Sequence, residues 1–218
     1  MRIIVEPMRI EHIPAVTAIE KHSFTQPWPV QAYRKEIQHN KMAHYYVAKR
    51  VDAPALTLAE LGIEEATAEP EPGLMERFTR LFRPPPVPVT PASQKELERV
   101  VGYAGLWLMV DEAHITTIAV HPKYRGYGIG ELLLLQMIET ANEIGARWLT
   151  LEVRKSNQVA QALYHKYTFK EMGVRRRYYS DDGEDALIMW TEPIDSDVFV
   201  ETVGRNRAAL EARLKDHG

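Results

Sequence analysis

Cysteine is absent from this chain of 218 residues. Without it, disulfide scaffolds, thiolate zinc sites and cysteine nucleophiles are excluded, and a reducing, cytoplasmic setting fits best. Long hydrophobic runs are also lacking, and the opening residues carry acidic and polar side chains throughout. We therefore expect neither a signal peptide nor insertion into a membrane. A net charge of −3, from 27 basic and 30 acidic side chains, argues against a general nucleic-acid binder.

Proline is unevenly distributed, because residues 52–98 hold eight of the 14 prolines. The same segment carries nine acidic and four basic side chains, a net charge of −5. Its run PPPVPVTP cannot belong to a helix or a central strand. We interpret residues 52–98 as a flexible insertion with one short amphipathic helix over Leu74–Phe82, which either docks on its own domain or binds a partner.

Strand-like and helix-like patterns alternate outside the insertion. Apolar, β-branched or aromatic runs predict strands, and apolar residues at helical spacing predict helices. The order favours an α/β or α+β fold with a mixed central sheet of about seven strands flanked by helices, in which the insertion joins two neighbouring strands. The predicted strands are 2–6, 45–49, 100–110, 114–120, 148–153 and two more around the turn SDDGED, and the predicted helices are 10–19, a segment after Trp28, 129–144, 157–167 and 198–214.

Residues 125–130, RGYGIG, form the most informative segment and are called the glycine turn below. Glycine permits positive φ and lets the backbone approach a ligand, so that successive N–H groups converge on an anion. The helix that starts here adds unpaired N–H groups and the positive end of its dipole, and Arg125 adds a full charge. The segment favours a phosphate or pyrophosphate site, although a glycine-rich turn can also be purely structural.

Two other phosphate-binding designs fit this segment less well. A Walker loop needs Lys followed by Ser or Thr after the glycines, and neither pair is present. A dinucleotide fingerprint needs a third glycine, and Glu131 stands in its place. Glu152 does lie at about the spacing of the acid in that fingerprint, so this second design stays open.

The glycine turn, preceded by TIAVHPKYRG, resembles the coenzyme A pyrophosphate loop of the GNAT N-acetyltransferases. The resemblance extends over nearly the whole chain outside the insertion and the C-terminal tail. It implies the GNAT fold, a single domain over residues 1–194 with a helical tail over 195–218, acetyl-CoA as co-substrate and no metal. Three segments resemble the RimI branch, which acetylates the N-terminal alanine of a small-subunit ribosomal protein: SFTQPWP (23–29), LEVRKSNQVAQALY (151–164) and RRRYYSDDGEDALIM (175–189).

The resemblance implies a role for each site residue. Glu152 would be the general base, and Tyr164 the acid that protonates the departing thiolate. The main chain of Ile118, Ala119 and Val120 would bind the pantetheine arm between two splayed parallel strands. Further contacts to coenzyme A are expected from Arg125, Gly126, Tyr127, Gly128, Ile129, Gly130 and Asn157, and contacts to the acceptor from Trp28, Tyr178 and Tyr179.

The catalytic candidates also have plainer interpretations. Glu152 fits an ordinary acid at a strand end, paired with Arg147 or Arg154. Tyr164 fits a core residue on a helix face, and Asn157 fits a helix cap.

The acidic turn, residues 180–185, would attract a basic peptide unless Arg175, Arg176 and Arg177 neutralise it. The eight histidines form no HExxH motif or close pair, so metal binding is not expected and His121 is expected at the surface. Thr168 stands where the family usually has a glycine at a helix end, which predicts strain or a different helix exit.

The resemblance implies an N-terminal amine as the acceptor. Such an amine needs less help from a base than lysine, because its pKa of about 7.7 to 8.0 is far closer to neutrality than the value of about 10.4 for lysine. The partner would be a ribosomal protein, with no direct contact to nucleic acid. Other acceptors of the GNAT family, such as lysine, small amines or other protein N-termini, are the enzymatic alternative. A coenzyme A-binding module without turnover, with the insertion as its docking arm, is the non-enzymatic one.

Overall fold

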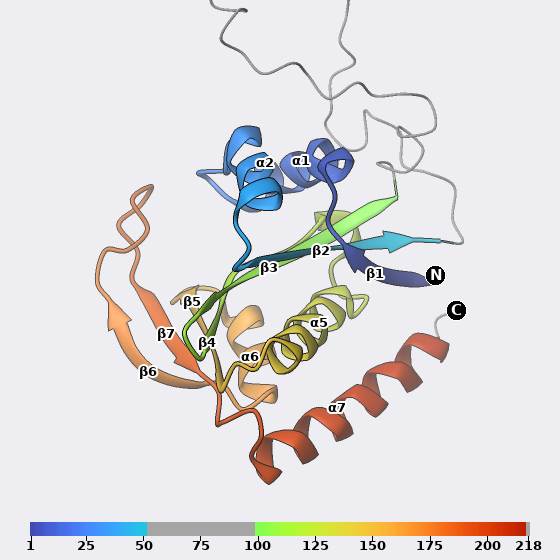
Figure 1. Ribbon diagram of the computed structural model, residues 1–218, viewed down its shortest axis with the longest axis vertical. Helices are drawn as coiled ribbons and strands as arrows, with labels where there is room; N and C mark the ends of the chain where they lie inside the picture. The colour runs from blue at the N-terminus through green and yellow to red at the C-terminus, as the bar shows by residue number, and fades with distance from the viewer. Residues whose placement is uncertain (52–98, 217–218) are drawn as a thin grey trace, which may run out of the picture.

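The computed structural model describes residues 1–51 and 99–216, and the statements below refer to these. Within these residues, seven strands form one mixed sheet in the order β1-β2-β3-β4-β5-β7-β6, which confirms the expected fold (Figure 1). Neighbouring strands are antiparallel except β4 and β5, which are parallel. The strands are β1 Ile3–Pro7, β2 Ala43–Arg50, β3 Val100–Met109, β4 Glu112–Val120, β5 Trp148–Arg154, β6 Lys170–Arg175 and β7 Ala186–Trp190.

Helices cover both faces of the sheet (Figure 1). α1 and α2 pack on one face, where Val16 and Tyr33 join a buried cluster with Tyr103 of β3. α5 packs on the other face, where Leu133 joins a second cluster with Ala104 of β3. Successive β3 residues thus serve opposite faces, as the period of a strand requires. The helices are α1 Ile13–Ser23, α2 Val30–His39, α5 Ile129–Glu143, α6 Gln158–Lys166 and α7 Asp197–Asp216, with 3-10 turns at Ile10–His12 and Pro122–Tyr124.

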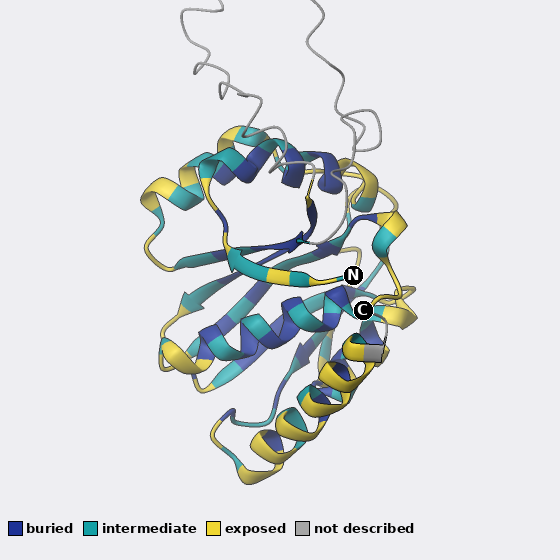
Figure 2. Cartoon of the chain, turned by 90° about the vertical axis from the view of Figure 1, so that its right-hand side faces the viewer, coloured by how far each residue is buried: buried dark blue, intermediate teal, exposed yellow. Residues whose placement is uncertain are grey.

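A glycine with positive φ lies at each end of α5. Gly128 is its N-cap with a φ of 79°, and Gly145, with a φ of 75°, follows its last turn, as the sequence predicted. α7 lies beside α5 and turns a largely exposed face to solvent (Figure 2). Its buried apolar side chains, Phe199 and Leu210, belong to the same core cluster as the apolar face of α5. The C-terminal helix is therefore packed onto the domain.

The segment 52–98 joins two strands that are neighbours in the sheet, as predicted. β2 ends at Arg50 and β3 begins at Val100, and the two strands pair antiparallel. The helix expected over Leu74–Phe82 lies outside the described residues. Among the helices that are described, none is long and apolar enough to cross a membrane.

The end of α6 confirms the strain expected at Thr168. This β-branched residue has a φ of 66°, in the left-handed region that glycine adopts without cost. The helix end is nevertheless hydrogen-bonded, because the N–H of Phe169 donates to the carbonyl oxygen of Tyr164 at 3.2 Å. Phe169 then packs against the ring of Tyr164, with 5.6 Å between ring centroids. The strained exit thus fixes the position of the Tyr164 ring.

Candidate active site

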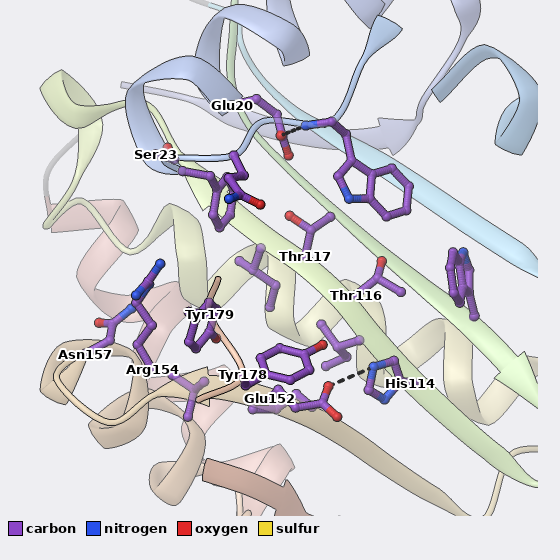
Figure 3. A pocket seen from close by; sticks show the side chains of 18 of the residues that line it. Glu20, Ser23, His114, Thr116, Thr117, Glu152, Arg154, Asn157, Tyr178 and Tyr179 are labelled. Carbon is purple, nitrogen blue, oxygen red and sulfur yellow. Dashed lines mark hydrogen bonds and ion pairs between the residues drawn. The ribbon is translucent and has the colours of Figure 1, made fainter. Parts of the chain in front are cut away.

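A cavity of about 420 Å³ lies where β4 and β5 diverge (Figure 3). The parallel pairing of these strands covers Glu112–Ile115 and Trp148–Leu151 and ends there. Beyond it, among the described strands, β4 pairs with β3 alone and β5 with β7 alone. The splayed parallel strands that the resemblance implied are therefore present, and their main chains face the gap.

The cavity collects residues from parts of the chain that are far apart in sequence. The loop between α1 and α2, residues 24–29, contributes one wall, and the hairpin between β6 and β7 contributes another. The floor comes from β4 and β5, and α6 closes one side. Seven of the residues singled out in the sequence line the cavity: Trp28, Ile118, Glu152, Asn157, Tyr164, Tyr178 and Tyr179.

Glu152 is a buried carboxylate in this cavity, with a side chain that is only 8% exposed. Its Oε2 lies 3.1 Å from Nε2 of His114, and its Oε1 lies 3.0 Å from Nη2 of Arg175. The hydrogen bond with His114 lowers the pKa of Glu152, against the effect of burial and together with the charge of Arg175. The carboxyl group is therefore ionised at neutral pH and able to accept a proton.

The predicted pairing of Glu152 with Arg147 or Arg154 was wrong. Arg147 lies over the ring of Trp148, 4.5 Å from its centroid. Arg154 turns to the acidic turn instead. Alternation along the strand does not separate Arg154 from Glu152, because residues two apart point to the same face. The guanidinium of Arg154 is instead taken up by the three carboxylates of the acidic turn.

His114 is a site residue that the sequence did not reveal. It lies opposite Thr150 in the parallel register, so Glu152, two residues further along β5, points to the same face of the sheet. Nδ1 of His114 lies 2.8 Å from Oγ1 of Thr150, whose hydroxyl contacts Glu112. In the sequence, His114 stood out only as a polar residue within an apolar strand. Its contact with Glu152 depends on the register between β4 and β5.

Tyr164 is both a core residue and part of the cavity wall. Burial raises the pKa of its phenol, with a smaller contribution from Tyr179. The hydroxyl therefore carries its proton throughout the neutral range. Both interpretations of Tyr164 apply, because the residue belongs to the core cluster and also lines the cavity.

Asn157 is the cap of α6, as one of its two interpretations predicted. Its Oδ1 accepts a hydrogen bond from the N–H of Ala160 at 3.2 Å. Such a bond satisfies one of the unpaired donors of the first helical turn. The residue also lines the cavity, so capping does not remove it from the site.

The glycine turn lies at the start of α5, and none of its residues lines this cavity. Gly126 and Gly128 have φ values of 85° and 79°. A Cβ at Gly126 would meet nothing within 4 Å, and one at Gly130 would come no closer than 3.8 Å to Val120. Packing within the chain therefore does not require glycine at Gly130. The free space beside a helix N-terminus fits the close approach of an anionic ligand such as pyrophosphate.

Arg154 holds the acidic turn, which corrects the expectation that Arg175–Arg177 would neutralise it. Its guanidinium lies 2.6 Å from Asp181, 2.9 Å from Asp182 and 3.0 Å from Glu184. The hydrogen bond from Arg154 holds the pKa of Asp181 well below its usual range, with help from Thr25. The single charge of Arg154 thus offsets part of the negative charge of this turn inside the molecule.

His121 is buried, not at the surface as expected. It is 3% exposed, and its ring lies 5.8 Å from that of His22 and 5.7 Å from that of Tyr124. The two histidines form a close pair that their distance in sequence did not suggest. Across the described residues, no group of three His, Asp or Glu side chains could hold a metal ion.

Glu20 is another residue that the sequence did not reveal. It is buried, and it accepts hydrogen bonds from the N–H of Trp28 and the hydroxyl of Tyr33, both at 2.7 Å, and from the hydroxyl of Tyr103. The bond to the main chain of Trp28 fixes the loop that carries this ring into the cavity. Trp28 then lies 6.1 Å from Trp107, ring centroid to ring centroid, in an aromatic wall.

The Acetyltransferase (GNAT) family model matches residues 56–169. A Bacillus subtilis (strain 168) protein, provisionally named a ribosomal protein bS18-alanine N-acetyltransferase, is 35% identical over 186 residues, or 85% of this chain and 93% of that protein. The chain belongs to the GNAT family of acetyltransferases, whose acetyl donor is acetyl-CoA. The resemblance seen in the sequence motifs is confirmed.

A relative from Escherichia coli (strain K12), the ribosomal protein bS18-alanine N-acetyltransferase, is 41% identical over 93 residues, which are 42% of this chain and 63% of that protein. The crystal structure of the Escherichia coli ribosomal-protein-S18-alanine N-acetyltransferase has the same fold. Its TM-score is 0.62 at 23% sequence identity, with 89% of this chain and 96% of that one covered.

Proposed function

We propose that this enzyme transfers the acetyl group of acetyl-CoA to the N-terminal amine of ribosomal protein bS18. The observation that carries the proposal is the similarity to the Bacillus subtilis protein, which spans nearly the full length of that protein. The cavity supports it, because an ionised carboxylate and a protonated phenol face the same space.

The donor side of the site is formed by the glycine turn and the free edge of β4. The N–H groups of Gly126–Gly130 and the charge of Arg125 would hold the pyrophosphate. Within residues 1–51 and 99–216, the main chain of Ile118, Ala119 and Val120 has no partner strand on the side of β5, so it would pair with the pantetheine arm. Asn157 would contact the same arm from the start of α6.

Glu152 would serve as the general base for the acceptor amine. Acetyl transfer needs a neutral amine, because an ammonium has no lone pair with which to attack the thioester. The reference pKa of an α-amine is about 7.7 to 8.0, so a single carboxylate, acting directly or through water, can take up its proton. The hydrogen bond with His114 and the charge of Arg175 keep Glu152 ionised for this step.

Tyr164 would donate a proton to the departing thiolate of coenzyme A. Its raised pKa keeps the hydroxyl protonated until that charge develops. The overall reaction takes an ammonium and a thioester to an amide and a thiol and releases one proton. Trp28, Tyr178 and Tyr179 would line the path of the acceptor, where their rings can cover a short peptide backbone.

Acetylation of short peptides tests the acceptor. One peptide carries the N-terminal sequence of bS18, a second is the same peptide with a blocked N-terminus, and a third has a blocked N-terminus and an added lysine. We expect mass spectrometry to detect acetylation of the first peptide alone. Acetylation of the third peptide would assign the enzyme to lysine acceptors, and binding of acetyl-CoA without any turnover would indicate a regulatory module.

A further inference from the structure

Glu131, one residue beyond Gly130 at the start of α5, contacts side chains from the end of α6 and from α7. Its side chain is 8% exposed. Lys166, at the end of α6, contacts its Oε1, and so does the hydroxyl of Tyr167 at 2.7 Å. Nη2 of Arg213 on α7 lies 2.6 Å from its Oε2.

The carboxyl group of Glu131 is charged despite its burial. Burial alone would raise its pKa, but hydrogen bonds from Lys166, Tyr167 and Arg213 lower the pKa below its ordinary value. Its negative charge lies within the first turn of α5, where N–H groups and the helix dipole attract anions. An uncompensated carboxylate there would compete for these groups and would repel a pyrophosphate. Lys166 and Arg213 supply the compensating charge.

A second contact links α7 to the glycine turn itself. Leu210 is 1% exposed, and a Cβ built on Gly128 would lie only 2.9 Å from its Cδ1. Leu210 and Arg213 are three residues apart, so they lie on one face of the helix. The amide of Asn206 also donates to the carbonyl oxygen of Lys166 at 2.7 Å. α7 is therefore in contact with the glycine turn, with Glu131 and with the end of α6.

We propose that the C-terminal helix α7 sets the affinity of the glycine turn for acetyl-CoA. Arg213 offsets the charge of Glu131, and Leu210 packs under Gly128 and holds the turn in its left-handed conformation. Both are positioning residues, because they act through Glu131 and Gly128 and not on the ligand. The inference rests on the proposed binding of acetyl-CoA at the glycine turn.

Calorimetric titration with coenzyme A tests the electrostatic part. In the full chain, Arg213→Gln should raise the Kd about five- to tenfold, in the range of a charge acting at a helix terminus. Glu131→Gln should not raise the Kd, because it removes the repelling charge. The double variant should bind as Glu131→Gln does, since Arg213 then has no charge to offset. Arg205→Gln, at an exposed position of the same helix, is the matched control and should bind as the wild type does.

Two further measurements separate this role from a merely structural one. The effect of Arg213→Gln should appear in the KM for acetyl-CoA and not in the KM for the peptide. It should be absent when acetyl-pantetheine, which lacks the phosphates, is the acetyl donor. Arg213→Lys keeps the positive charge and should restore most of the affinity. This variant also serves if Arg213→Gln does not fold.

A folded Arg213→Gln variant with the Kd of the wild type would overturn the inference. The inference would also be overturned if Arg213→Gln lowered the affinity equally in the wild type and in the Glu131→Gln variant. Failure of the wild-type chain to bind coenzyme A would instead refute the proposed function, so the two ideas fail in distinguishable ways.

Discussion

Glu152, in the cavity, and Glu131, beside the glycine turn, are both buried carboxylates, but different parts of the chain hold them. The partners of Glu152 come from β4 and β6, within the sheet. The partners of Glu131 come from the end of α6 and from the C-terminal helix. Glu152 lines the cavity, whereas Glu131 does not. In the proposed function, the first carboxylate exchanges a proton with the acceptor, whereas the charge of the second is compensated by its partners.

The largest effect is expected at the donor end, from Gly130→Asp. Two like charges about 4 Å apart near a protein surface repel by about 4 kcal/mol, which is close to a thousandfold in Kd. Calorimetry with coenzyme A should therefore detect almost no binding. Gly130→Ala is the matched control, since a Cβ fits within the protein at this position, and it should fold normally and bind more weakly than the wild type. If Gly130→Asp bound coenzyme A as strongly as the wild type does, the pyrophosphate would not bind at the glycine turn.

The next largest effect is expected at the acceptor end, from Glu152→Gln. Loss of a general base lowers kcat/KM by about 100-fold or more. Since the pKa of Glu152 is lowered, the wild-type rate should rise with pH until the acceptor amine is neutral, at about pH 8. The loss in the variant should be greatest at low pH, where the amine is charged. An unchanged pH profile would show that another group takes the proton.

Tyr164→Phe should have a smaller effect than Glu152→Gln. The variant lacks the proton donor for the thiolate, whose own basicity is modest, so we expect about a tenfold loss in kcat. The Kd for acetyl-CoA should not change. A loss of binding equal to the loss of rate would show that Tyr164 acts only through packing against Phe169.

The acidic turn offers a finer test of the acceptor end. Because Arg154 already contacts three of its carboxylates, we expect only a few-fold preference for a basic peptide over an acidic one, visible in KM at low salt. Replacing Asp181 and Asp182 by lysine should reduce this preference. Equal kcat/KM for an Ala-Arg and an Ala-Glu peptide would eliminate selection by charge.

The smallest effect is expected from replacing residues 52–98 by a short glycine-containing turn. Arg50 and Arg99 flank the segment, and the N–H of Arg50 donates to the carbonyl oxygen of Arg99 at 2.9 Å. A short connection can therefore close the hairpin between β2 and β3. Thermal unfolding and turnover of a short peptide should match those of the full chain. A loss of either would place part of this segment in the core or the site.

The order of the elements could be predicted from the sequence, because it follows from local periodicity. The helix between Gly128 and Gly145 shows this, since both its apolar face and its glycine ends are encoded locally. The pairing of Glu152 could not be predicted, because its contact with His114 depends on the register of two strands that are far apart in sequence. The contact of Arg213 with Glu131 depends in the same way on how α7 packs.

The intact mass of bS18 tests the central claim most directly. The protein would be purified from cells that lack this enzyme and from the same cells carrying the wild-type chain or Glu152→Gln at equal expression. We predict one N-terminal acetyl group with the wild-type chain, none in its absence and little with Glu152→Gln. Full acetylation of bS18 in cells that lack the enzyme, or in cells that carry only the Glu152→Gln variant, would contradict the account.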